Sequence, residues 1–324
     1  MLATPIPKPG PIVSSFLLKG HTLKDPGPAF TSSPDTHQQE RQERQEQVEH
    51  QEHQEVWVIL LAFQRSGTHW LSQELKRHPC VHMAPEILFA PGLKEFGWNP
   101  LMRRAVIKKF FGLPLSQDER QQKLPSTAQE FAKESDAALQ RGCAVRGFNW
   151  KVSQGFLQDL LWIKSFIAQH NVRIIWLQRQ NMLRRFVSME SNRRTSVAGT
   201  TDAKEADRVR NERVPVRIKQ LLRDLSDREA EVKEIDTFLQ VQEGKVLRLV
   251  YENLTDVSGV LGFALQDSGC KALPPLQSLQ SQALKPQLPS FQKLHTGSLS
   301  NLVENWKEVE AALRQTRWAW MLQN

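Results

Sequence analysis

The chain has 324 residues, of which 40% are hydrophobic, and its 43 lysines and arginines against 35 aspartates and glutamates give a formal charge of +8. No stretch approaches the roughly 20 consecutive apolar residues of a membrane-spanning helix, and the N-terminus lacks the basic-then-apolar layout of a secretory signal. The basic residues are scattered rather than gathered with stacking aromatic residues, which argues against a nucleic-acid partner. The charge fits an anionic ligand without requiring one.

Cys80, Cys143 and Cys270 are the cysteines of the chain, and they form neither a CxxC motif nor a Cys/His pair at zinc spacing. This pattern argues against a disulfide scaffold and against a structural metal site. It favours a reducing compartment, so we expect a cytoplasmic protein.

Residues 1–55 differ in composition from the rest of the chain. Residues 1–36 are rich in proline, glycine, serine and threonine, and residues 40–55 place a glutamate at every third position with a single aliphatic residue, Val48. Such segments have no apolar stripe to bury. We predict a disordered or low-complexity tail over residues 1–55, with an organelle transit peptide as an alternative, and a folded domain over residues 56–324.

Apolar runs rich in β-branched residues predict buried strands, and amphipathic patterns between them predict helices. The predicted strands are residues 56–63, 144–150, 172–177 and 246–251, and the predicted helices are residues 70–77, 156–170, 183–194, 214–225 and 299–322. Strands that alternate with helices form parallel sheets covered on both faces. We therefore predict an α/β fold, a three-layer sandwich with a central parallel sheet.

The first predicted strand leads into Arg65, Ser66, Gly67 and Thr68 and then into a helix. The first turn of a helix offers unpaired N–H groups and the positive end of the helix dipole, so it attracts anions. Gly67 lets the backbone approach a phosphate closely, Arg65 adds a cation, and the two hydroxyl side chains add donors. We predict a P-loop-like phosphate-binding turn.

This turn differs from the nucleoside-triphosphate loop GxxxxGK[ST] at the positions that hold a triphosphate. Ala62 replaces the first glycine, Thr68 replaces the lysine, and His69 replaces the hydroxyl residue that binds magnesium. These replacements disfavour a P-loop kinase-like nucleotide enzyme, which stays as an alternative. The turn suits a single phosphate-sized group joined to a larger molecule.

The segment RSGTHW at residues 65–70 resembles the motif [RK]-S-G-T-x-[WL] of the sulfotransferases that use 3′-phosphoadenosine 5′-phosphosulfate (PAPS). Arginine at the first position is the form seen in the carbohydrate-modifying branch, which includes the nodulation-factor enzymes. The resemblance implies that the turn holds the 5′-phosphosulfate of PAPS and that Trp70 stacks on its adenine. The donor-binding residues that it implies here are Arg65, Ser66, Gly67, Thr68, His69 and Trp70.

Two later segments extend the resemblance over residues 56–322. A strand followed by Arg179, and by a helix that carries Ser188, resembles the family's site for the 3′-phosphate, although the two residues stand one position farther apart than in cytosolic members. The segment YENL from Tyr251, followed by LGF, resembles the segment that lies beside the adenine. The resemblance thus implies that Arg179 and Ser188 bind the 3′-phosphate and that Tyr251 lies near the base.

The resemblance also implies a catalytic base, for which two residues compete. The segment PCVHMAPEILF resembles a segment of the carbohydrate branch in which a glutamate before an apolar pair is the base, and here that residue is Glu86. His82 is the rival, because an imidazole suits neutral pH and cytosolic members use a histidine. Arg65 is the expected cation for the charge on the leaving oxygen. Lys151 lies two residues beyond the lysine position of the branch's GFK segment, which puts a direct role for it in doubt.

These features together predict a PAPS-dependent sulfotransferase that transfers a sulfuryl group to a hydroxyl of a glycan or another small-molecule acceptor, with no metal required. The alternatives are the kinase-like enzyme and a catalytically inactive scaffold that binds a nucleotide or a partner protein. The sequence carries no code for the acceptor or for the oligomeric state.

Overall fold

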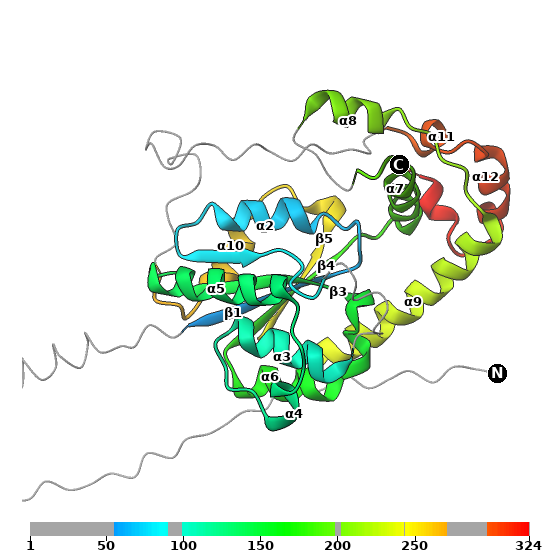
Figure 1. Cartoon of the computed structure of the whole chain (residues 1–324). Helices are drawn as coiled ribbons and strands as arrows, with labels where there is room; N and C mark the ends of the chain where they lie inside the picture. Colours follow the sequence, from blue (N-terminus) through cyan, green and yellow to red (C-terminus); the bar gives the residue numbers. More distant parts are fainter. Residues whose placement is uncertain (1–54, 90–98, 198–201, 243, 271–296, 324) are drawn as a thin grey trace, which may run out of the picture. The chain divides into compact units, whose positions relative to one another are not determined.

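The computed structural model describes residues 55–89, 99–197, 202–242, 244–270 and 297–323 (Figure 1). They belong to one compact unit, His53–Asn324, and the tail predicted over residues 1–55 lies outside the described residues apart from Glu55. No helix within the described ranges is long and apolar enough to cross a membrane.

Five parallel strands form the central sheet in the order β2-β3-β1-β4-β5. They are β1 (Val56–Ala62), β2 (Val81–Ala84), β3 (Val145–Lys151), β4 (Val172–Gln178) and β5 (Val246–Val250). All seven residues of the central strand β1 are buried, as expected for a strand covered on both faces. The predicted α/β fold with a central parallel sheet is confirmed.

Helices cover both faces of this sheet, which makes three layers (Figure 1). The longer helices of the described residues are α2 (Thr68–Lys76), α3 (Pro100–Phe110), α5 (Ser126–Gln140), α6 (Leu160–Gln169), α7 (Met182–Thr195), α8 (Ala203–Arg210), α9 (Ile218–Gln240), α10 (Ser258–Leu265) and α12 (Trp306–Arg314). Helices α2 and α10 pack on one face with Val58 and Leu60 of β1. Helices α3 and α6 and the second half of α9 pack on the other face with Ile59 and Leu61. Alternate residues of β1 thus enter two apolar clusters, and the turn that follows β1 starts from a rigid base.

The C-terminal part differs from the single helix predicted over residues 299–322. It contains two α-helices, α11 (Leu299–Leu302) and α12, and a 3₁₀ turn, η6 (Ala319–Leu322). The backbone of Val214 interrupts the helix, because its N–H donates to Leu302 O at 2.9 Å and its carbonyl accepts from the N–H of Glu304 at 2.9 Å. The same pairing keeps the chain before Ile218 out of a helix, so α9 begins four residues after the predicted start at 214.

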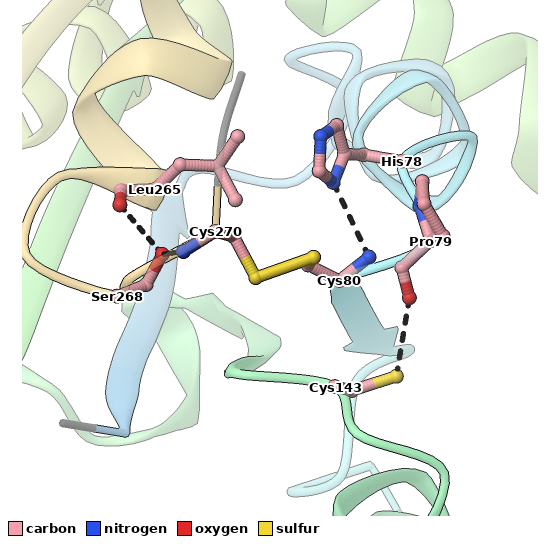
Figure 2. Close-up of a disulfide and its surroundings, with 7 residues drawn as sticks. All are labelled: His78, Pro79, Cys80, Cys143, Leu265, Ser268 and Cys270. Atoms are coloured by element: carbon pink, nitrogen blue, oxygen red, sulfur yellow. Dashed lines mark hydrogen bonds between the residues drawn. A yellow bond between two sulfur atoms is a disulfide. The ribbon is translucent and has the colours of Figure 1, made fainter. Parts of the chain in front are cut away.

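One disulfide joins Cys80, just before β2, to Cys270, which follows α10 (Figure 2). Their Cα atoms are 6.6 Å apart, although 190 positions separate them in the sequence. Cys143 stays a buried thiol that donates to the carbonyl of Pro79 at 3.4 Å. The cysteine pattern did not predict this pair, since no local spacing marks a bridge that depends on the packing of α10 against the sheet. Disulfides persist under oxidising conditions, so the pair does not support the reducing compartment that we expected.

Reduction of this disulfide is expected to lower the free energy of unfolding by about 2–4 kcal/mol, because the bridge closes a long loop and limits the unfolded chain. Denaturant unfolding of the oxidised and the reduced protein measures the difference, and Cys270→Ser should unfold like the reduced protein. Cys143→Ser is the matched control and should keep the oxidised value. Equal unfolding free energies of the oxidised and the reduced protein would contradict the pairing.

Candidate active site

The predicted site residues come together at the carboxyl edge of the sheet. The phosphate turn follows β1, Glu86 lies two residues after β2, and Lys151 is the last residue of β3. Arg179 directly follows β4, and Tyr251 directly follows β5. In open parallel sheets, ligands bind at the carboxyl ends of the strands. The strand order therefore brings five separate segments of the chain to one place.

The turn between β1 and α2 has the backbone geometry of an anion site. Arg65 and Gly67 both lie in the left-handed region, with φ of 65° and 83°. Gly67 precedes the first residue of α2 and, as the N-cap residue, has no side chain with which to cap that helix. Successive N–H groups in such a turn form a concave cradle, and the helix dipole adds positive potential. The predicted phosphate-binding turn thus has a backbone that suits an anion.

Tyr251, the single tyrosine of the chain, packs against Gly67. A Cβ atom at Gly67 would lie 2.3 Å from Tyr251 Cε2, and the left-handed φ would strain any larger residue. The guanidinium carbon of Arg179 lies 5.2 Å from the centre of the tyrosine ring, in cation–π contact. Tyr251 therefore supports the turn from β5 while it also contacts Arg179.

Arg179 and Ser188, the two residues that the resemblance assigns to the 3′-phosphate, lie directly against the turn. Arg179 Nη1 donates to the carbonyl of Arg65 at 3.1 Å. Arg65 Nε donates to Ser188 Oγ at 2.9 Å. These two bonds hold Arg65 in its left-handed conformation. Burial, together with the charge of Arg179, lowers the pKa of Arg65 to about 10, so the guanidinium of Arg65 stays charged at neutral pH.

Two buried polar atoms at the turn lack a hydrogen-bond partner among the described residues. They are the hydroxyl of Ser66, which is 0% exposed, and Nε of Arg179, whose side chain belongs to a residue 8% exposed. Buried polar atoms in proteins nearly always have a partner. Donors left unpaired beside a phosphate-type turn fit the oxygen atoms of an anionic ligand.

Lys151 adds a lysine amine from β3 to the arginine that the turn already contains. The register of the sheet sets Lys151 beside Ala62, the last residue of β1. Its Nζ donates to the hydroxyl of Thr68 and lies 3.5 Å from Glu86 Oε1. Burial lowers the pKa of Lys151, and the carboxylate of Glu86 opposes that shift. The sequence left the role of Lys151 in doubt, but the structure brings its amine to the first residue of α2.

Glu86 is held among polar groups of the site. Gln154 Nε2 donates to Glu86 Oε2 at 3.1 Å, and the N–H of Lys151 donates to Gln154 Oε1 at 3.0 Å. His69 Nε2 lies 3.9 Å from Glu86 Oε1, and burial is the main cause that lowers the pKa of His69. The side chain of Glu86 is 20% exposed, so a substrate hydroxyl could reach it. The sequence analysis did not identify Gln154, because its role depends on the fold.

His82, the rival base, lies within β2, beside α3. Its ring is 6.4 Å from that of Phe110 on α3, in a stacked arrangement. Burial and the nearby cations, Lys76 first among them, lower its pKa to about 4. The structure therefore brings Glu86, and not His82, to Lys151 and His69.

Trp70 lies on the first turn of α2, half-buried against the cluster formed by α2 and α10. Two residues after Trp70, Ser72 Oγ donates to Asn149 Oδ1 at 2.6 Å. Asn149 occupies the position of the lysine in the GFK segment of the resembled branch, and it joins α2 to β3.

Within the described ranges no three His, Cys, Asp or Glu side chains gather as a metal site requires.

A cavity of about 1290 Å³ lies between α9 and β5, away from these residues. Charged side chains line it, and four of them form ion pairs: Arg317 with Glu229 at 2.6 Å and Arg248 with Asp236 at 3.7 Å. It contains none of the residues that the sequence predicts for the site. We therefore place the candidate site at the turn after β1.

Known proteins match the chain in structure but not in sequence. No family model and no curated protein matches the chain. Among solved structures, the chain is similar to the sulfotransferase domain from the Synechococcus PCC 7002 olefin synthase, with 18% sequence identity and a TM-score of 0.32. The similarity covers 68% of this chain and 76% of that one.

Proposed function

We propose that this protein is a sulfotransferase that moves the sulfuryl group of PAPS to a hydroxyl of a carbohydrate or another alcohol. The observation that carries the proposal is the turn after β1, where unpaired buried donors and three cationic side chains surround the start of α2 beside a carboxylate. The resemblance of residues 65–70 and of the later segments to that family supports the same ligand.

In the proposed complex, the chain's own donors bind the two phosphate-bearing ends of PAPS. The N–H groups of the turn, the hydroxyls of Ser66 and Thr68 and the side chain of Arg65 would bind the 5′-phosphosulfate. Arg179, whose Nε is unpaired within the described residues, would bind the 3′-phosphate. Trp70 and Tyr251 are the candidates for contact with the adenine, where stacking on an aromatic side chain contributes about 1–3 kcal/mol.

Glu86 is the proposed base of the transfer. It accepts the proton of the acceptor hydroxyl while the acceptor oxygen forms a bond to sulfur and the bond from sulfur to the bridging oxygen breaks. The electron pair of that bond stays on the departing adenosine 3′,5′-bisphosphate. Arg65 and Lys151 stabilise the negative charge that develops there, which is the main task of an enzyme in this class of reaction.

The contact between Lys151 and Glu86 suggests how donor and base are coupled. Without a ligand, the two groups neutralise each other across 3.5 Å in a largely buried place. A phosphosulfate bound at Thr68 would attract the amine and leave the carboxylate free for the acceptor proton. The base is then most available when the donor is present.

A kinase-like function is the second candidate, and one contact favours it. Lys151 donates to Thr68, so a neighbouring strand supplies a lysine where the GxxxxGK[ST] loop has its own. The two candidates differ in their need for magnesium. Phosphoryl transfer from ATP should stop in a chelator, whereas sulfuryl transfer should continue.

Labelled donor tests the proposal directly. The protein is incubated with ³⁵S-labelled PAPS and a panel of glycans, phenols, lipids and small alcohols in the presence of a chelator. Transfer to any acceptor supports a sulfotransferase. Tight binding of the donor product without transfer to any acceptor in the panel supports the inactive scaffold, and transfer of phosphate from MgATP instead supports the kinase-like enzyme.

Replacement of Arg179 by alanine is expected to weaken binding of adenosine 3′,5′-bisphosphate about ten- to hundredfold, the usual effect of losing a charge-assisted hydrogen bond. Isothermal calorimetry measures the affinity. Arg193→Ala on α7 is the control, because Arg193 is exposed and its one ion pair among the described residues is with Glu190 of the same helix. Wild-type affinity in Arg179→Ala would remove Arg179 from the proposed site.

A further inference from the structure

Two arginines donate hydrogen bonds to backbone carbonyls of the turn. Arg179 donates to the carbonyl of Arg65, and Arg185 Nε donates to the carbonyl of Gln64 at 2.9 Å. In a trans peptide the C=O of one residue and the N–H of the next point in opposite directions. An arginine on the carbonyl of Gln64 therefore directs the N–H of Arg65 to the other side of the turn, away from α7.

Arg185 is buried, which limits its contact with a ligand. It is 7% exposed, and its guanidinium carbon lies 5.3 Å from the centre of the Phe63 ring, beneath the turn. Its place on α7 is three residues before Ser188, so both residues reach the turn from one face of the helix. Arg185 thus contacts the backbone of the turn, through the carbonyl of Gln64.

The surroundings of Arg185 are unfavourable for a purely structural side chain. Arg228 of α9 lies 5.4 Å from the same Phe63 ring, so two guanidinium groups share one aromatic side chain. Glu231 pairs with Arg228 and partly offsets the repulsion. Burial and Arg228 lower the pKa of Arg185 to about 10, and it still carries its charge at neutral pH. Hydrophobic residues in place of buried ion pairs are often neutral or stabilising, so stability alone does not explain a charge here.

We propose that Arg185 is a positioning residue, which preorganises the turn for an anion through the carbonyl of Gln64 and does not touch the ligand. The inference rests on the proposed function for the identity of the anion, but not for the conformation of the turn. A charged donor holds that carbonyl more firmly than a neutral donor does, so the N–H groups are already oriented before the ligand arrives.

Two variants and a control test this role. Arg185→Met keeps the apolar stem without a donor, Arg185→Lys keeps a charged donor without the planar fork, and Arg193→Ala changes an exposed arginine of the same helix. Two quantities are measured for each: the affinity for adenosine 3′,5′-bisphosphate, and amide hydrogen exchange of residues 64–68 in the ligand-free protein. Thermal unfolding identifies any variant that has lost its fold.

Arg185→Met is expected to bind the bisphosphate about ten- to hundredfold more weakly and to exchange the amides of residues 64–68 faster, while the amides of β1 stay protected. In both affinity and exchange rate, Arg185→Lys should fall between Arg185→Met and the wild type, and Arg193→Ala should match the wild type. Unchanged exchange in a folded Arg185→Met protein would overturn the inference, as would faster exchange throughout the sheet.

The two proposals fail in different ways. If the wild type does not bind the bisphosphate, the proposed function is wrong, and the exchange measurement alone still decides the role of Arg185. If the wild type binds and Arg185→Met binds equally well, the turn stays the proposed donor site and the positioning role is wrong. Should Arg185→Met not fold, the Arg185→Lys variant decides: weaker binding with faster exchange of residues 64–68 supports the positioning role, and wild-type affinity and exchange overturn it.

Discussion

Gly67→Ala is expected to abolish detectable binding of adenosine 3′,5′-bisphosphate. The new Cβ would lie 2.3 Å from Tyr251 Cε2, and alanine would have to keep a φ of 83°. Left-handed strain and overpacking each cost about 1–3 kcal/mol, and here both act on the turn that we propose binds the donor. The turn or the tyrosine must move, and either movement takes the N–H groups out of place. Calorimetry with the bisphosphate measures the loss.

A matched control separates the effect of backbone strain at a left-handed φ from the effect of the Cβ collision with Tyr251. Gly142 has a φ of 84°, but a Cβ there meets nothing within 4 Å. Gly142→Ala should therefore lose some stability and keep its affinity. The double variant Gly67→Ala with Tyr251→Ala removes the ring that collides, and it should regain part of the turn's protection from amide exchange. Wild-type affinity in Gly67→Ala would contradict both the geometry of the turn and its role.

Glu86→Gln is expected to lower turnover by about a hundred- to ten-thousandfold, the range for loss of a general base, and to leave donor-product binding close to wild type. The amide keeps the size of the side chain, and its carbonyl can still accept from Gln154. It cannot accept the acceptor's proton. Steady-state turnover from labelled PAPS and calorimetry with the bisphosphate measure the two effects separately.

Glu190→Gln on α7 is the control for this experiment, because the side chain of Glu190 has a similar exposure, 17% against 20% for Glu86, and pairs with an exposed arginine. It should leave turnover unchanged. If Glu86→Gln retained turnover, the proton would have to be taken by another group at the turn, and His69, 3.9 Å from Glu86, would be the first to test.

The parts of the site that the sequence predicts are those set by local order along the chain. The strand at 56–63 and the turn after it form one continuous pattern, and β1, the turn and α2 follow it closely. The strand ends at Arg179 and Tyr251 are equally local, because each follows an apolar run that forms a strand, although β5 is only partly buried, unlike β4. Parallel strands then bring their carboxyl ends together without further information.

The parts that the sequence does not predict depend on contacts between distant segments. Lys151 reaches Thr68 only because the register of the sheet sets it beside Ala62. No motif in the segment around Lys151 predicts this contact. The disulfide and the support from Arg185 arise in the same way, from packing across long separations. Strand β2 is too short for a clear pattern, and α3 and α5 were not predicted in the segment between residues 78 and 143.

Calorimetric titration of the wild-type protein with adenosine 3′,5′-bisphosphate, in a chelator, tests the central claim most directly. We expect saturable binding of one molecule per chain, strongly weakened in both Arg179→Ala and Gly67→Ala and unchanged in Arg193→Ala. Absence of binding to the folded wild type across several temperatures, or equal affinity in all four proteins, would contradict the assignment of this turn as a donor site.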